Sequence, residues 1–323
     1  EPEIWELIDM HVNKSKRYLE LGIPGLEIYH NPQVKYKAGW FQVLSESLAQ
    51  VRFRKPATFL QAAIPILYRF KPVYTSPKNL TGNKSRMEDM LKRLKTSPDL
   101  WERFDKEPLI AIYHSHTSEC YLSRDGTVRT SNGLPGDVVD VGETLARSLW
   151  DYGISVIHSK KIHDFPIWRK SYINSEITMK AIARENSNLF AMLDLHRDAG
   201  TGTDQTGSNV VNINGKNAAR VFIVVGSDRL GLPHPHWKNN YSFALKLHHK
   251  IESFFPGLSR GVNLRHDGRW NQHVHPRALI LEIGDIYNEI AEAKYTAKLL
   301  AMVLADMIME DALPEKLSNM RTG

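Results

Sequence analysis

The chain has 323 residues, of which 42% are hydrophobic and 24% are charged. This composition supports one large folded domain or two ordinary ones and argues against a disordered protein. The single cysteine, Cys120, excludes a disulfide framework and any cysteine-rich zinc or iron–sulfur module. A net charge of +6 favours anionic partners, such as a wall polymer, a membrane surface or nucleic acid, and selects none of them.

No segment of the sequence reaches the roughly 20 apolar residues that a membrane span needs. The best candidate, residues 59–68, is interrupted by Gln61 and Pro65 and has basic flanks. The chain begins with Glu1 rather than Met, so we expect that an upstream segment was removed. The membrane would then be reached only through a missing N-terminal anchor.

The first third of the chain shows no strand–helix alternation. Helical patterns are expected at residues 4–21 and 87–104. Residues 76–85 are rich in Ser, Thr, Asn, Gly and Lys, which is typical of a linker or a long surface loop. We therefore predict a helical N-terminal region over residues 1–105, with a linker near 76–85.

From Pro108 onward, short apolar runs alternate with amphipathic stretches, which predicts an α/β domain. The expected strands are 109–113, 155–158, 189–195, 220–225 and 278–283. The expected helices are 138–152, 168–185, 241–254 and 289–309. Because parallel strands joined by helices are buried on both faces, these apolar runs fit a mostly parallel twisted sheet flanked by helices. We predict this domain over residues 106–312, followed by a polar tail at 313–323.

Ionisable side chains stand at the ends of three expected strands, where open α/β sheets collect their sites. His116 and Glu119 follow the first strand, His196 ends the third, and Glu282 ends the last. A charged group next to a buried strand is costly to desolvate unless something compensates it. One metal ion would compensate all of them.

Two imidazoles and one carboxylate form the ligand set of zinc hydrolases, which leaves a fourth position open for water. His116, Glu119 and His196 are our predicted ligands. Glu282 would take a proton from the attacking water and deliver it to the leaving nitrogen. Asp194 alternates onto the strand face of His196, so it either orients that imidazole or has a plain structural role.

Three alternatives remain open at this point. His114 shares the strand face of His116 and could replace it as a ligand, although its place inside the strand favours a hydrogen-bonded core histidine. Cys120 could be a nucleophile activated by His116 or His196, although a lone cysteine is usually a small buried residue. The domain could also be a non-catalytic wall-binding module. Nucleic acid is not an expected partner, because no basic–aromatic recognition motif is present.

Five segments resemble, in the right order, the stage II sporulation protein P family over residues 108–310. They are residues 112–121 (IYHSHTSECY), 194–198 (DLHRD), 255–262 (FPGLSRGV), 270–272 (WNQ) and 279–284 (LILEIG). The family is similar to zinc-dependent N-acetylmuramoyl-L-alanine amidases. Carried over by position, the resemblance implies Zn²⁺ held by His116 and His196, with Glu282 as the catalytic glutamate.

The resemblance also implies a biological setting. Members of the family remodel septal peptidoglycan during engulfment of the forespore, cutting the bond between glycan strand and stem peptide. They are also described as endopeptidases that act on peptide cross-links. An N-terminal membrane helix anchors them, facing the intermembrane space. They work beside a lytic transglycosylase and a membrane partner, the stage II sporulation proteins D and M.

The sequence departs from the wider amidase group at the carboxylate ligand. That group has a His-Gly-Gly turn and takes its glutamate from the start of the next helix, whereas here Glu119 follows His116 by three residues. We favour Glu119 because zinc carboxypeptidases also use His-x-x-Glu with a distant His. The rival carboxylates, near the next expected helix, are Asp137, Asp140 and Glu143.

Three arginines are candidates for binding stem-peptide carboxylates or an oxyanion. Arg197 adjoins His196, Arg265 lies ahead of the last strand, and Arg260 sits in a glycine-flanked loop. We rank Arg260 first, with a surface salt bridge as its alternative role.

Overall fold

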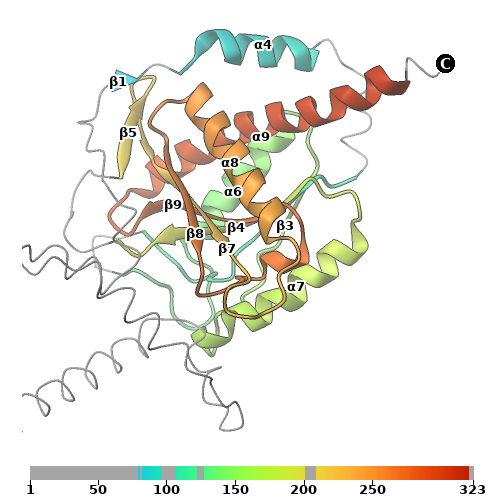
Figure 1. The fold of residues 1–323 in the computed structure, drawn as a ribbon. Coiled ribbons are helices and arrows are strands. Elements are labelled where there is room, and N and C mark those ends of the chain that lie inside the picture. The colour runs from blue at the N-terminus through green and yellow to red at the C-terminus, as the bar shows by residue number, and fades with distance from the viewer. Residues whose placement is uncertain (1–78, 81, 96–106, 122–126, 201–208, 320–323) are drawn as a thin grey trace, which may run out of the picture. The chain divides into compact units, whose positions relative to one another are not determined.

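The computed structural model describes residues 79–80, 82–95, 107–121, 127–200 and 209–319 (Figure 1). The chain divides into two units, Glu1–Thr75 and Ser76–Gly323, and all described residues belong to the second. The helix predicted at residues 4–21 and most of the predicted N-terminal region lie outside the described residues. The predicted boundary near residue 105 stays a prediction.

The centre of the second unit is a six-stranded sheet that is mostly parallel, as predicted. Its strands in spatial order are β3 (Val156–His158), β2 (Ile110–Tyr113), β4 (Ala191–Asp198), β9 (Ala278–Asp285), β7 (Val221–Gly226) and β8 (Ser259–Arg265). The first four strands run parallel to one another. β7 is antiparallel to β9 and parallel to β8, so the last two strands at this side of the sheet run in the opposite direction.

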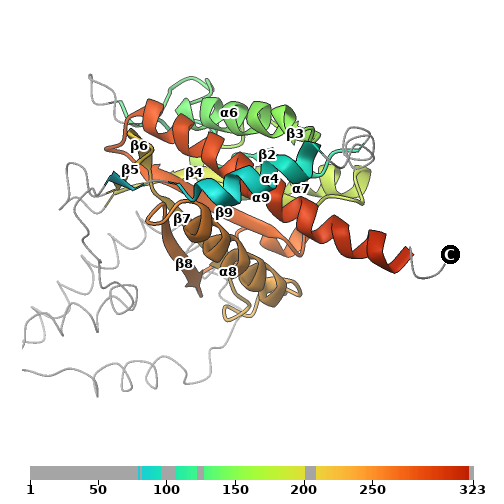
Figure 2. The same ribbon diagram turned by 90° about the horizontal axis from the view of Figure 1, so that it is seen from above.

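Helices cover both faces of this sheet (Figures 1 and 2). One face packs against α6 (Asp137–Asp151), α8 (Trp237–Phe254) and α9 (Ile290–Asn319). The other face packs against α7 (Ser171–Glu185), which follows the short 3₁₀ helix η3 (Trp168–Lys170). Helix α4 (Lys84–Lys95) lies outside the first helical layer and contacts α8. The structure thus confirms a sheet flanked by helices.

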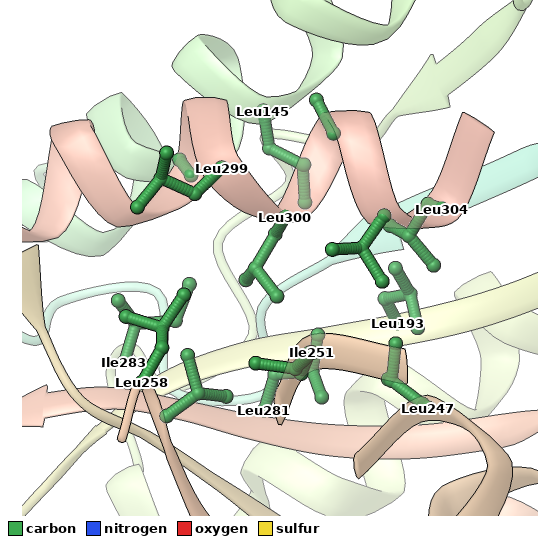
Figure 3. Close-up of a cluster of buried hydrophobic side chains, with 14 of the residues drawn as sticks. Leu145, Leu193, Leu247, Ile251, Leu258, Leu281, Ile283, Leu299, Leu300 and Leu304 are labelled. Atoms are coloured by element: carbon green, nitrogen blue, oxygen red, sulfur yellow. The ribbon is translucent and has the colours of Figure 1, made fainter. Parts of the chain in front are cut away.

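Successive side chains of each strand point to opposite faces of the sheet. In β2, Ile110 and Ile112 enter the larger core, whereas Ala111 and Tyr113 face α7. Figure 3 shows leucines of α9 pointing at the strands in the larger core. Because both faces are buried, β2 and β4 consist almost entirely of buried residues.

Several elements differ from the sequence prediction. Strand β8 was not expected, because its partly exposed residues at the sheet edge carry no apolar pattern. A hairpin of β5 (Val210–Ile213) and β6 (Lys216–Ala219) was also missed, because both strands are only four residues long and β6 (KNAA) carries no strand pattern. Helix α9 continues to Asn319. The helix thus extends seven residues into the predicted polar tail, which stays a prediction as a boundary.

Two described elements begin inside the predicted linker. β1 (Asn79–Leu80) pairs with β5, and α4 starts at Lys84. Met90 of α4 is fully buried in the larger core. None of the described helices has the length and hydrophobicity of a membrane span.

The parallel register sets the position of the polar residues. Tyr113 of β2 is opposite Asp194 of β4, and His196 of β4 is opposite Glu282 of β9. The carboxyl ends of these three neighbouring strands therefore meet at one edge, on the sheet face of α7.

We expect Leu300→Ala to lower the free energy of unfolding by about 2–5 kcal/mol, because it opens a cavity in the larger core. Leu300 is fully buried among side chains of α9, α8 and the sheet. The matched control is Ile173→Ala on α7, whose residue is 63% exposed. It should change stability by no more than about 0.5 kcal/mol in urea unfolding. Equal effects of the two variants would contradict this packing.

Candidate metal centre

The structure brings the two predicted zinc histidines together. His116 lies in the turn after β2 and His196 near the end of β4, and both side chains are buried. Their ring centres are 5.2 Å apart, with the ring planes at 84°. Two imidazoles bound by ~2.0–2.1 Å bonds to one tetrahedral ion have ring centres roughly 5 Å apart. This spacing is compatible with a shared ion.

Glu119, the predicted carboxylate ligand, lies beside His196. Its Oε2 is 3.2 Å from His196 Nδ1, and its Oε1 is 3.7 Å from the guanidinium of Arg197. Burial would raise the pKa of Glu119, but the hydrogen bond and charge of His196, together with Arg197, lower it to about 2. Glu119 is therefore an ionised carboxylate inside the protein.

Asp194 holds the other side of the His196 ring. Asp194 Oδ1 is 2.9 Å from His196 Nε2 and accepts a hydrogen bond from the backbone N–H of Ser115. The Ser115 hydroxyl donates to Asp194 Oδ2. Burial alone would lower the pKa of His196, but Asp194 and Glu119 raise it well above its ordinary value. The imidazole is thus fixed between two carboxylates.

His116, Glu119 and His196 suit a divalent cation for two reasons. They offer two imidazoles and a carboxylate, and one of their buried polar atoms has no hydrogen-bond partner. Among the described residues, no three His, Cys, Asp or Glu side chains already surround a single point as a metal site does. Even so, the 3.2 Å between Glu119 Oε2 and His196 Nδ1 is close to the ~3.3 Å edge of a tetrahedral zinc site. His116 Nδ1 is buried without a hydrogen-bond partner. A cation between them would take the place of the proton that Glu119 and His196 share.

Glu282 extends from β9 next to this group. Its Oε2 is buried and has no hydrogen-bond partner among the described residues. Burial raises the pKa of Glu282 to about 8. A nearby divalent cation would lower that pKa again, because it favours the carboxylate form. A carboxyl whose pKa lies near neutrality can both accept and donate a proton, which is what a general acid–base needs.

The rival carboxylates have other partners. Asp137 accepts a hydrogen bond from the Tyr121 backbone, and exposed Asp140 pairs with Lys294. Glu143 is bound by Arg147 and Lys160. None of the three has a described contact with His116 or His196, so the geometry favours Glu119.

His114 is a buried and hydrogen-bonded histidine. Its Nδ1 donates to the carbonyl of Leu195, and its Nε2 is 2.9 Å from His158 Nε2. Burial and the neighbouring His158 lower the pKa of His114 to about 3. With both ring nitrogens engaged, His114 fits the core role that its place in the sequence favours.

Cys120 lacks the features of a catalytic thiol. The residue is 7% exposed, and its Sγ lies 3.6 Å from the carbonyl oxygen of Ser118. Burial raises the pKa of Cys120, whereas a nucleophilic cysteine needs a lowered one. The geometry does not favour the cysteine mechanism.

A family model, that of stage II sporulation protein P, matches residues 69–305 of this chain. The chain belongs to the stage II sporulation protein P family. It is 31% identical over 212 residues to the stage II sporulation protein P of Bacillus subtilis (strain 168), a match that covers 62% of this chain and 51% of the relative. The chain thus spans about half the length of this relative.

Two solved structures of amidases resemble this member of the sporulation protein P family. The CwlD amidase of Clostridioides difficile, solved with the GerS lipoprotein, has a TM-score of 0.43 and 13% identity, over 63% of this chain and 98% of that one. The N-acetylmuramoyl-L-alanine amidase AmiC2 of Nostoc punctiforme has a TM-score of 0.38 and 13% identity, over 63% and 97%.

The three predicted arginines of this family member are each held by a carboxylate. Arg197 is buried, and it also donates to the carbonyls of Cys120 and Val128. Arg260 pairs with Asp198 at 2.9 Å and lies over Phe222. Arg265 pairs with Asp267 and lies over Trp270. Arg197 therefore braces the turn that carries Glu119, while substrate roles for Arg260 and Arg265 stay predictions.

Sequence reasoning missed an aromatic wall beside the histidines. Trp168 stacks on His116 with ring centres 4.3 Å apart and planes at 4°, and Tyr172 meets the same imidazole edge-on at 5.5 Å. Both residues come from the start of the α7 segment. Because they lie about fifty positions from His116, nothing in the local sequence could signal the contact.

The family motif at residues 270–272 ties this wall to the sheet. Asn271 donates to the carbonyl of Tyr172 and to Ser175 on α7. Gln272 accepts from the Gly226 N–H and donates to the Val224 carbonyl on β7. The motif is thus explained by structure, because it fixes the position of α7 over the site.

We expect Arg197→Met to destabilise the fold by about 3–5 kcal/mol, since it removes one of the two cations beside buried Glu119 and leaves the carbonyls of Cys120 and Val128 without their donor. Urea unfolding would measure the loss. The control is Arg147→Met, which removes an exposed i,i+4 pair with Glu143 and should cost about 0.5 kcal/mol or less. A neutral Arg197→Met would show that Arg197 does not brace this turn.

Proposed function

We propose that this chain is a zinc-dependent peptidoglycan hydrolase, an N-acetylmuramoyl-L-alanine amidase that separates stem peptide from glycan. The observation that carries the proposal is the meeting of His116, Glu119 and His196 at the ends of β2 and β4, with Glu282 opposite His196 in β9. Membership of the sporulation protein P family and the names of the similar amidases support the substrate class.

In this proposal His116, Glu119 and His196 hold Zn²⁺, and Asp194 orients the His196 imidazole. When bound, the ion polarises the scissile carbonyl and helps water to ionise. Glu282 accepts the water proton, most directly on its unpartnered Oε2, and passes it to the amide nitrogen. A C–O bond forms as the C–N bond breaks, and the amine leaves protonated.

The finer biological assignments rest on the family alone. We propose that the enzyme acts in septal wall remodelling and forespore engulfment, with additional endopeptidase activity on cross-links. Its place would be extracytoplasmic, in the intermembrane space at the forespore septum, where a longer chain carries a membrane anchor. The proposed partners are peptidoglycan and the stage II sporulation proteins D and M.

We expect the purified chain to retain about one equivalent of zinc and to lose hydrolysis on chelation. Metal content by elemental mass spectrometry and muropeptide masses after digestion, with and without chelator, test both statements. The muropeptide masses also identify the cleaved bond, because an amidase releases whole stem peptides and an endopeptidase opens cross-links. Undiminished digestion of wall by metal-free protein would overturn the zinc mechanism.

Glu282→Gln should keep the metal and lower hydrolysis by roughly 10²–10⁴-fold, because it removes the proton carrier and no proposed ligand. The matched control is Glu185→Gln at the exposed end of α7, which should keep both metal and activity. Full activity in Glu282→Gln would rule out Glu282 as the base. Loss of zinc in the same variant would instead make Glu282 a ligand.

A further inference from the structure

Arg129 lies directly across a short antiparallel pairing from Glu119. The two residues form a β-bridge, flanked by backbone hydrogen bonds from Cys120 N to Val128 O and from Thr130 N to Ser118 O. Buried Arg197 binds the carbonyls of Cys120 and Val128, and so links the two segments. Residues directly opposite in an antiparallel pair project to the same side. The backbone therefore holds Arg129 beside the candidate metal centre.

The guanidinium of Arg129 contacts the same tryptophan, Trp168, as the proposed zinc ligand His116. Its central carbon is 4.4 Å from the centre of a Trp168 ring, and the same side chain stacks on His116 at 4.3 Å. Cation–π contact positions a guanidinium by its flat face and leaves its edge N–H groups free for a ligand. Trp168 thus sets the distance between the Arg129 cation and the His116 imidazole.

Arg129 differs from the other arginines around the centre. Arg197, Arg260 and Arg265 each have a carboxylate within 4.0 Å. Arg129 is exposed, and its described side-chain contact is with Trp168 rather than with a carboxylate. A guanidinium fork matches a carboxylate in a bidentate way. Arg129 is therefore the arginine of these four whose charge is not matched by a carboxylate within 4.0 Å among the described residues.

We propose that Arg129 is a substrate-binding residue, which holds a carboxylate of the stem peptide beside the Trp168–His116 stack. This inference rests on the proposed function, because it names the part of the substrate that lies on the α7 side of the centre. Recognition of a free carboxylate would favour acidic stem peptides over amidated ones, and it would place the scissile amide between Arg129 and Glu282.

The test compares the affinity of soluble muropeptides with free carboxylates and the same muropeptides after chemical amidation. Binding is measured by titration calorimetry with the full chain in a Glu282→Gln background, which keeps the ligand intact. We expect the parent chain to bind the free-carboxylate form roughly 10–100-fold more tightly, as for a charge-assisted hydrogen bond. Arg129→Gln should lose that preference and bind both forms equally weakly.

Two further variants control the experiment. Arg129→Lys keeps the charge without the planar fork and should retain part of the preference. Arg184→Gln removes an exposed cation at the far end of α7 and should retain all of it. An unchanged preference in Arg129→Gln, equal losses in Arg184→Gln, or no preference in the parent chain overturns the assignment. Wall digestion by the wild-type chain, assayed in parallel, decides the proposed function separately.

Discussion

The site depends on a buried charge network that is satisfied only when β4 and the turn after β2 come together. Asp194, His196 and Glu119 are all nearly inaccessible, and such groups are costly to bury unless each finds a partner. Ser115 and Arg197 supply the remaining hydrogen bonds. Because these partners come from β4 and from the turn after its neighbour β2, the network and the sheet register stabilise each other.

The chain's sequence predicted the parts of the site that strand periodicity controls. The five apolar runs from residue 109 correspond to β2, β3, β4, β7 and β9, and the polar residues at their ends meet because parallel strands end at one edge. The likeness of His-x-x-Glu to zinc carboxypeptidases favours Glu119 over Asp137, Asp140 and Glu143, and the structure places Glu119 3.2 Å from His196. Periodicity could not reveal β8, whose residues at the edge are only partly buried.

Contacts between distant segments account for what the sequence left out. Trp168 and Tyr172 reach His116 only because α7 packs across the ends of β2 and β4, and Asn271 fixes α7 through two hydrogen bonds. The roles of the arginines were equally hidden. Arg197 looked like a ligand-binding residue beside His196, whereas its side chain is buried and contacts two carbonyls and one carboxylate, which fits a structural role. Proximity in the sequence indicates which side chains lie close together. It does not indicate which of them are already hydrogen-bonded within the protein.

At this edge of the sheet, some polar side chains are held by hydrogen bonds and others have an unpaired atom. The first kind fixes the geometry of the site, and the second kind can bind a ligand. His196 and Glu119 have every polar atom engaged or close to a partner, which fixes their geometry. In contrast, His116 Nδ1 and Glu282 Oε2 are buried without partners. Leaving such atoms unpaired costs stability, so a folded protein retains them where a ligand compensates the cost. The two residues belong to β9 and to the turn after β2, the strands on either side of β4, so in the proposed mechanism the ion and the substrate amide would meet beside His196.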